Sequence, residues 1–194
     1  MGLYDRHDTL NLKTPNSISV VGVGGIGYWV AKYAAMSGIE KIYLFDPDVI
    51  EENNLNRLDF SYEYIGRNKA EVTRETIIKI RPFISVYSMP YILQEHTFPK
   101  TEWLIDCTDK IKSQLENQRI AKKFGSKYCK AGYNGESITI ANSVAEWTAV
   151  DVPDGYTIIP SWVAPAVIVA SLTVAKIMKY SEKEISKKIY DVFD

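Results

Sequence analysis

Short apolar runs alternate with longer stretches of mixed polarity through most of the chain. β-Branched and aliphatic residues fill the runs, which predicts strands at residues 17–23, 41–46, 85–90, 103–107 and 127–131. Apolar positions between these runs recur at helical spacing, which predicts helices at residues 25–37, 66–80 and 111–124. Strands that alternate with helices indicate an α/β fold, in which a mainly parallel sheet carries helices on both faces.

The pattern changes after Gly132. Residues 137–142 and 146–150 resemble a hairpin or meander, so we expect an antiparallel extension of the sheet after residue 132. Residues 181–194 are charged and predict a short surface helix. No segment rich in proline or glycine divides the chain, so residues 1–194 are expected to form a single domain.

Residues 162–178 form the most apolar stretch and raise the question of a membrane span. A spanning helix needs about 20 apolar residues. This stretch is shorter, begins near Pro165 and contains Lys176. We therefore expect a helix packed on the sheet and no membrane partner.

A glycine-rich turn follows the first predicted strand in the sequence G-V-G-G-I-G. Gly22, Gly24 and Gly27 fit the pattern G-x-G-x-x-G at a strand-to-helix junction. Without side chains, such a turn lets a phosphate approach the backbone and the N–H groups at the start of the helix. A tight turn without a ligand would satisfy the same pattern.

The next predicted strand ends in Asp46, where a nucleotide-binding fold places a carboxylate against ribose hydroxyls. A solvated acid or a turn cap is the alternative role for this residue. The glycines and Asp46 together are compatible with an NAD(P)-dependent oxidoreductase. Such an enzyme also needs a hydride-transfer partner residue, which the sequence does not reveal.

Further polar residues favour a triphosphate site. Arg57 and Lys69 are candidates for the fixed cations that surround departing phosphate charge, and an exposed surface position is the alternative for each. Lys69 lies in the first turn of a predicted helix, where the helix dipole adds to its charge. The inner face of that helix is expected to hold Ala70, Thr73, Ile77 and Ile80.

Four ordered motifs carry a family resemblance: G-V-G-G-I-G, F-D-P-D-V-I-E-E-N-N-L-N-R, I-G-R-N-K-A and D-C-T-D. From about Tyr4 to the late apolar helix, the sequence resembles the ThiF/MoeB/HesA group, bacterial relatives of ubiquitin-activating enzymes. The resemblance implies a Rossmann-like fold and the adenylation of a carboxylate with MgATP, releasing pyrophosphate. The usual carboxylate is the C-terminal glycine of a ubiquitin-like protein.

The resemblance also implies residue roles. It assigns ATP binding to Gly22, Gly24, Gly25, Gly27, Asp46, Asp48, Asn54 and Asn56, and catalysis to Arg57, Lys69, Asp109 and Arg6. Asp109 would hold Mg²⁺, although Lys110 departs from the usual residue at the next position and is able to pair with it. Arg6 would reach the γ-phosphate in the partner subunit of a homodimer, and a charged tail is the alternative for its segment.

The chain has two cysteines, Cys107 and Cys129, and no C-x-x-C pair. Many members of the group hold structural zinc with two such pairs, so no zinc is expected here. Some members form a thioester or persulfide through a cysteine on a mobile loop. The corresponding segment, residues 151–160, has no cysteine, so covalent transfer is not expected. Both cysteines are expected to pack in the core and to be inert.

Composition limits the partners. A net charge of −1 gives no attraction towards nucleic acid. The polar N-terminus lacks the apolar stretch of a signal peptide, so a cytoplasmic location is expected. No ubiquitin-like segment is present, so a ubiquitin-like or peptide carboxylate must be supplied in trans. A non-catalytic scaffold that binds nucleotide or a ubiquitin-like protein stays open as an alternative.

Overall fold

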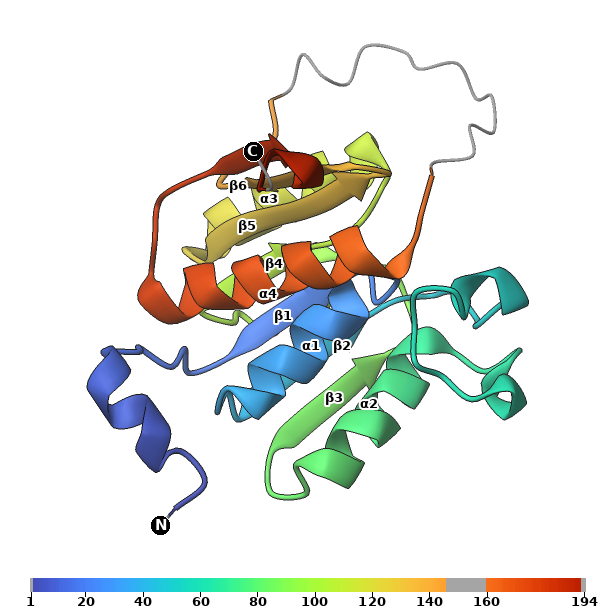
Figure 1. Cartoon of the computed structure of the whole chain (residues 1–194), viewed down its shortest axis with the longest axis horizontal. Coiled ribbons are helices and arrows are strands. Elements are labelled where there is room, and N and C mark those ends of the chain that lie inside the picture. Colours follow the sequence, from blue (N-terminus) through green and yellow to red (C-terminus); the bar gives the residue numbers. More distant parts are fainter. Residues whose placement is uncertain (1, 146–159, 193–194) are drawn as a thin grey trace.

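The computed structural model describes residues 2–145 and 160–192. Within these residues a seven-stranded sheet has the order β3-β2-β1-β4-β5-β6-β7 (Figure 1). The strands are β1 (Ile18–Val21), β2 (Lys41–Phe45), β3 (Ser85–Met89), β4 (Trp103–Asp106), β5 (Lys127–Asn134), β6 (Ser137–Ala141) and β7 (Ile185–Lys188). Strands β1 to β5 all run parallel to one another, whereas β6 and β7 are antiparallel to their neighbours. The parallel sheet and its antiparallel extension are therefore confirmed.

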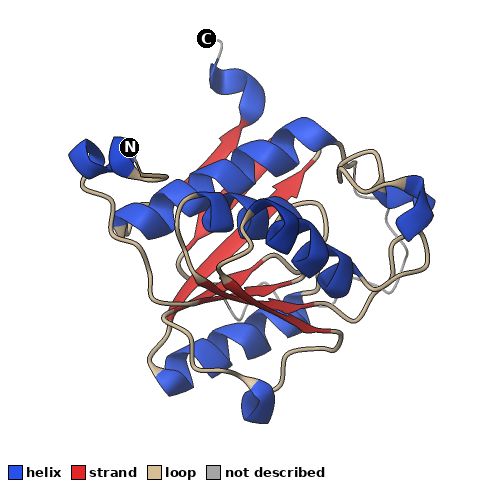
Figure 2. Ribbon diagram, turned by 90° about the horizontal axis from the view of Figure 1, so that it is seen from below, coloured by secondary structure: helices blue, strands red, loops and turns tan. Residues whose placement is uncertain are grey.

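Helices cover both faces of this sheet (Figure 2). The long helices are α1 (Gly27–Met36), α2 (Lys69–Ile80), α3 (Ile111–Phe124) and α4 (Val163–Lys179). The main core joins buried residues of α1, α2 and α4 to one face of the strands, including Ala31, Ile77 and Ala170. A second core packs Ile120 and Ala121 of α3 against the other face. Short 3-10 helices complete the fold: η1 (Asp5–Leu10), η2 (Glu52–Asn54), η3 (Tyr62–Tyr64), η4 (Glu95–Thr97) and η6 (Ile189–Val192).

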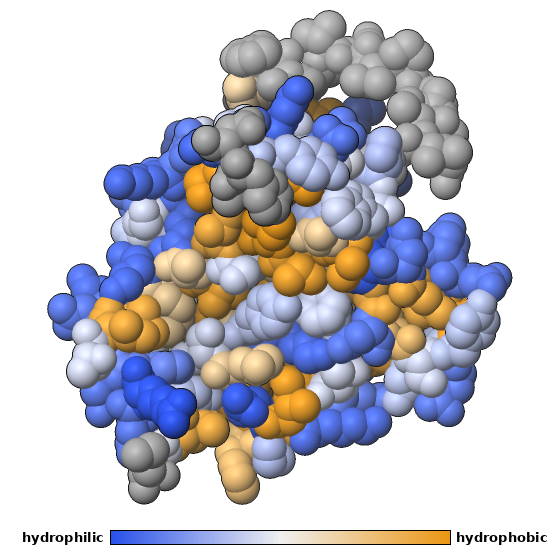
Figure 3. Space-filling model, viewed as in Figure 1, coloured by the Kyte–Doolittle hydropathy of each residue, from blue (hydrophilic) through white to orange (hydrophobic). Residues whose placement is uncertain are grey.

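The late apolar stretch forms α4, which packs on the sheet beside α1, as expected. Lys176 is buried in this helix, and its ammonium group donates to the backbone carbonyls of Ser181 and Lys183 at 2.6 and 2.7 Å. None of the helices in the described residues is long and apolar enough to cross a membrane. The outer side of α4 keeps apolar residues at the surface, and Figure 3 shows hydrophobic atoms gathered over it.

Three expectations about secondary structure need correction or fall outside the described residues. The charged C-terminal piece was expected to be helical, but Ile185–Lys188 pairs with β6 as an edge strand before η6 begins. Ile80 was placed on the inner face of α2 and is instead 37% exposed, because it is the last residue of the helix. The second strand of the expected hairpin, residues 146–150, lies outside the described residues.

The strand order reverses direction at β1. The chain passes from β1 to β2 and β3 on one side and then returns to β4 on the other side of β1. In open α/β sheets, ligands bind at the carboxyl ends of the strands where the order reverses. This point lies at the ends of β1 and β4, where the glycine-rich turn and the D-C-T-D segment follow.

Candidate nucleotide site

The glycines of the turn between β1 and α1 have two different physical roles. A Cβ on Gly27 would lie 1.9 Å from the carbonyl oxygen of Gly22, so only glycine fits there. Gly22 has a φ of +81°, and a Cβ on it would meet the Cys107 backbone at 3.1 Å. These two glycines build the turn. Gly24, by contrast, has none of the described residues within 4 Å of its Cβ position, its chain neighbours aside, so its surface is open to a ligand.

Gly25 faces two side chains that come from other parts of the chain. Its Cβ position lies 2.9 Å from Cδ of Arg57 and 3.1 Å from the hydroxyl of Tyr133. Because glycine has no side chain, Arg57 is able to lie directly against the turn at Gly25. The structure therefore brings Arg57 together with the phosphate-binding candidates, as expected from the sequence.

Asp46 directly follows β2 and is buried beside the same turn. One carboxylate oxygen accepts a hydrogen bond from the backbone N–H of Val23 at 2.6 Å, and the other accepts from Asp48 N–H at 2.9 Å. Burial raises the pKa of Asp46, and the two backbone N–H groups and the Lys69 charge oppose that shift. Each oxygen has capacity for another donor, so the carboxylate is able to accept ribose hydroxyls.

Lys69 begins α2 close to this carboxylate. Its ammonium group lies 3.3 Å from the Asp48 carboxylate, and only 13% of the Lys69 side chain is exposed. Asn68 fixes the arrangement, because its side-chain amide donates to the carbonyls of Asp46 and Asp48 at 2.9 and 3.0 Å. Its oxygen caps the helix by accepting from Glu71 N–H at 3.1 Å. Sequence reasoning assigned Asn68 no role, although Asn before a helix is a recognised capping signal.

The segment around η2 holds Arg57 in place. The Arg57 guanidinium donates to the carbonyl of Asn53 and to the side-chain oxygen of Asn56, both at 2.8 Å. Trp29 of α1 donates from its indole nitrogen to the Arg57 carbonyl at 2.8 Å. Asn54 is buried and accepts from Glu51 N–H at 3.2 Å, so in this structure it stabilises the loop. A rigid loop keeps the guanidinium over Gly25.

The two aspartates of the D-C-T-D segment differ completely in environment. Asp106 is fully buried and accepts four hydrogen bonds, two from Thr108 and one each from Asn117 and Tyr128. Asp109 is exposed and has no hydrogen bond or ion pair among the described residues. Lys110 makes no ion pair with it there either. The structural role of Asp106 was missed, although its place at the end of an apolar strand indicates burial.

An apolar pocket of about 480 Å³ lies beyond the ends of β2 and β3, next to Asp46 in the chain. Its lining includes Pro47, Pro90, Tyr91 and Ile92. Sequence reasoning did not find this pocket, because its residues come from two segments whose proximity depends on the pairing of β2 with β3. A flat apolar pocket beside a buried ribose-binding candidate suits an aromatic base.

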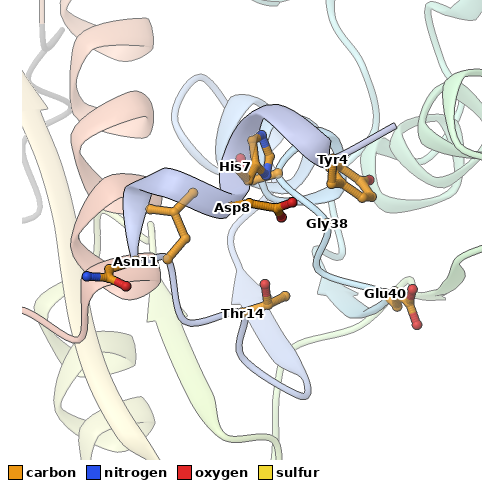
Figure 4. A pocket seen from close by; sticks show the side chains of 9 residues that line it. Tyr4, His7, Asp8, Asn11, Thr14, Gly38 and Glu40 are labelled. Atoms are coloured by element: carbon orange, nitrogen blue, oxygen red, sulfur yellow. The ribbon is translucent and has the colours of Figure 1, made fainter. Parts of the chain in front are cut away.

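The N-terminal segment lies at the opposite end of the sheet (Figure 1). There η1 and the turn after α1 enclose a pocket of about 400 Å³ that includes Tyr4, His7 and Gly38 (Figure 4). Arg6 is exposed and does not line this pocket. The structure therefore keeps Arg6 away from the glycine turn of its own chain.

The cysteines lie close to the switch point without chemical activation. Cys129 is buried, and Cys107 is partly buried and packs against the main core. Burial raises the pKa of Cys129 to about 12 and raises the pKa of Cys107 as well. Both thiols are therefore protonated at neutral pH, and the expectation that they pack in the core is confirmed for Cys129.

A buried carboxylate, an open glycine turn and a fixed arginine at the switch point of a parallel sheet define a Rossmann-like nucleotide-binding protein. The chain belongs to the ThiF family, whose sequence pattern it matches over residues 3–155. The family resemblance expected from the four motifs is confirmed.

Relatives support the same grouping. Ubiquitin-like modifier-activating enzyme 5 of Caenorhabditis elegans is 37% identical over 86 residues, which are 44% of this chain and 20% of the relative. Adenylyltransferase and sulfurtransferase UBA4 of Eremothecium gossypii is 29% identical over 113 residues, covering 56% of this chain and 26% of the relative. The matched region thus spans about a quarter or less of these two curated relatives.

Solved structures share the fold. The crystal structure of E. coli MccB with ATP superposes with a TM-score of 0.75 at 23% identity. The match covers 90% of this chain and 63% of MccB. The Rossmann-like α/β architecture predicted from the sequence is thereby confirmed.

Proposed function

We propose that this chain uses ATP to adenylate a carboxylate, most directly the C-terminal glycine of a ubiquitin-like sulfur-carrier protein. The observation that carries the proposal is the open surface of Gly24 beside Gly25 and Arg57, with the buried Asp46 carboxylate next to it. This arrangement offers separate places for a phosphate chain and a ribose. The names of the relatives, an activating enzyme for ubiquitin-like modifiers and an adenylyltransferase, support this reading.

The site suits ATP lying along the carboxyl edge of the sheet. The pocket around Tyr91 would hold the adenine, and Asp46 would accept hydrogen bonds from the ribose. The phosphates would then cross Gly24 and Gly25, where the start of α1 directs backbone N–H groups outward. The loops beside the phosphates would be held in shape by contacts of Asn54, Asn56 and Asp48.

Catalysis requires charge compensation and no general base. A carboxylate is already ionised at neutral pH. Its oxygen attacks the α-phosphorus, the bond to the pyrophosphate oxygen breaks, and pyrophosphate leaves with its charge. Arg57 and Lys69 would stabilise the charge that develops on the leaving group, because both ammonium and guanidinium groups are held in place before substrate binds.

Asp109 suits a magnesium ion that arrives with ATP. Mg²⁺ commonly keeps several waters and binds one or two carboxylates together with substrate phosphates. Asp109 is an exposed carboxylate at the carboxyl edge, and no group of three acidic, histidine or cysteine residues in the described residues forms a complete metal cage. When bound there, Mg²⁺ would neutralise phosphate charge. No zinc site is proposed, since the chain has no C-x-x-C pair.

We further propose a homodimer built on the outer face of α4. Val163 and Ile168 of this helix are 42% and 39% exposed, and Val167 and Leu172 are partly exposed. A second copy covering this apolar face would bury it. A dimer also offers the route by which Arg6, remote from its own glycine turn, would reach a partner's triphosphate.

The remaining proposals concern setting and organisation. We place the protein in the cytoplasm, where ATP and carrier proteins are available, with no nucleic-acid or membrane partner. Residues 1–194 are proposed to act as a single domain around the one sheet. The carrier is supplied in trans, since the chain contains no ubiquitin-like segment.

The test is ATP–pyrophosphate exchange with purified carrier proteins that end in Gly-Gly. Radioactive pyrophosphate should enter ATP only when the intact carrier is present, and a carrier lacking its terminal glycine is the matched control. Nucleotide binding without exchange for any carrier would instead support the non-catalytic scaffold. Exchange that is equal with intact and truncated carriers would refute the proposed carboxylate.

A further inference from the structure

We propose that the hydroxyl of Tyr133 binds the reacting carboxylate, and then the acyl carbonyl, of the substrate. Tyr133 would thus be a specificity residue that recognises the acyl side of the acyl-adenylate. The inference rests on the proposed function and concerns a residue to which sequence reasoning assigned no role.

Tyr133 reaches the glycine turn because β5 is longer than its neighbour. Asp106, the last residue of β4, pairs with Lys130 of β5, and β5 then continues to Asn134. Tyr133 therefore projects beyond the carboxyl edge of the parallel sheet. Its hydroxyl lies 3.1 Å from the Cβ position of Gly25, on the side of the turn that Arg57 also contacts.

The strand order indicates which part of the substrate this hydroxyl meets. The apolar pocket lies after β2 and β3, Asp46 directly follows β2, and the glycine turn follows β1. A nucleotide with its base and ribose at the first two positions places its α-phosphate over the turn. The acyl group then extends towards β4 and β5, which lie on the other side of β1 and carry Tyr133.

Hydrogen bonds prepare the phenol for this role. The Tyr133 hydroxyl shares a hydrogen bond with the Ser161 hydroxyl. The carbonyl of Ser161 accepts from the Asn56 amide at 3.0 Å, and the Asn56 oxygen accepts from Arg57. When Ser161 donates to the phenol oxygen, the phenol proton is free for a substrate oxygen. Tyr133 and Arg57 are thus held in one network beside Gly25.

The proposed role involves no proton transfer. The carboxylate oxygen that attacks the α-phosphorus forms the new phosphorus–oxygen bond, and pyrophosphate takes the electron pair of the broken bond. The other carboxylate oxygen accepts the Tyr133 hydrogen bond before the reaction and becomes the acyl carbonyl oxygen after it. Tyr133 keeps its proton throughout and orients the nucleophile.

Calorimetric titrations test the assignment with two ligands. Glycylglycyl-sulfamoyl-adenosine is a stable mimic of the acyl-adenylate and carries the acyl group, whereas AMP lacks it. Tyr133→Phe should weaken binding of the mimic about 10-fold. It should leave AMP affinity within about twofold and melting unchanged, because the ring is retained. Ser161→Ala breaks the same hydrogen bond but keeps the phenol, so it should weaken mimic binding by clearly less. Tyr87→Phe, on the edge strand β3, is the remote control.

The outcomes separate this inference from the proposed function. Equal binding of the mimic by the wild-type chain and Tyr133→Phe would overturn the role of Tyr133 while leaving adenylation intact. Equal losses in Tyr133→Phe and Ser161→Ala would reduce Tyr133 to a structural support for Ser161 and likewise overturn it. A wild-type chain that binds neither AMP nor the mimic would refute the proposed function, and this inference with it.

Discussion

Asp106 and Asp109 belong to one motif but have opposite environments. Asp106 satisfies four donors inside the fold, whereas Asp109 has its carboxylate in solvent. A motif match alone cannot distinguish them, because both are aspartates near the end of one strand. The difference becomes visible only when the partners from α3 and β5 are in place.

Asp106→Ala should destabilise the protein by about 3 kcal/mol or more, since several buried donors lose their acceptor. Urea denaturation measures this loss. Asp109→Ala is the matched control and should change the free energy of unfolding by less than about 0.5 kcal/mol while reducing Mg²⁺-dependent exchange. Similar stability losses in both variants would contradict the division of roles.

Lys69→Ala should reduce ATP–pyrophosphate exchange about 100-fold or more, because a fixed cation near the phosphates is removed. Its melting temperature should change little. Lys79→Ala on the same helix is the control, since that lysine contacts Tyr64 and lies away from the glycine turn. Full exchange activity in Lys69→Ala would exclude Lys69 from the site.

Nucleotide affinity should depend on pH through Asp46. Burial raises the pKa of this carboxyl in the folded protein, so it gains a proton at a higher pH than an ordinary aspartate. Ionised Asp46 therefore lowers the free energy of unfolding near neutral pH. This loss of stability disappears as the pH falls through the folded-state pKa and the carboxyl takes up its proton. Adenosine affinity should fall over the same range, because the protonated carboxyl is a weaker acceptor for the ribose.

Titration of adenosine binding as the pH is lowered from neutral checks this expectation, because adenosine carries no phosphate that would titrate as well. In Asp46→Asn the affinity should be lower at neutral pH and nearly independent of pH across the range. A wild-type profile that matches that of Asp46→Asn would show that Asp46 does not govern nucleotide binding.

At the scale of elements, the turn between β1 and α1 contains glycines with two different roles, one in folding and one proposed in ligand binding. Gly27 is required for folding, because a side chain would overlap the Gly22 carbonyl. Gly24 has no such constraint among the described residues, so the fold leaves its surface open for the proposed phosphate. The pattern G-x-G-x-x-G predicts the turn and does not by itself reveal this difference.

Gly24→Ala should therefore fold normally and lose most of its ATP affinity, because the methyl group holds phosphate away from the backbone. Gly27→Ala should destabilise the protein by several kcal/mol, since its Cβ would lie 1.9 Å from a backbone oxygen. Thermal melting and ATP titration of the two variants check both statements. Unchanged ATP binding in Gly24→Ala would move the phosphates away from the turn.

Sequence patterns predicted most elements because burial on a regular period is a local signal. They led to the proposals for Asp46, Arg57, Lys69 and the glycines, which stand in contiguous motifs. They did not identify Tyr133 or the pocket around Tyr91, because those depend on strand pairing between distant segments. The C-terminal strand was missed for the same reason, since Ile185–Lys188 becomes a strand only by pairing with the free edge of β6.

At the scale of the whole molecule, the sheet places the proposed site at one end and the N-terminal segment at the other (Figure 1). The apolar outer face of α4 lies between them. If a second copy covers this face, Arg6 belongs to a site formed by two chains. The fold of one chain supplies every other residue proposed for the reaction.

Ile168→Asp should convert the proposed dimer to a monomer, because it places a charge in the apolar contact. Ile80→Asp is a matched control, since Ile80 and Ile168 are 37% and 39% exposed. Sedimentation velocity measures the oligomeric state of each variant. A wild-type chain that sediments as a monomer would contradict the dimer.

The most direct test of the central claim is intact-mass spectrometry of a carrier protein ending in Gly-Gly after incubation with ATP, Mg²⁺ and the wild-type chain. Adenylation predicts a carrier adduct of one AMP, which is absent when the terminal glycine is removed or when Arg57→Ala replaces the wild-type chain. An unmodified carrier in the presence of bound ATP, across the Gly-Gly carriers tested, would contradict the account and leave a nucleotide-binding scaffold.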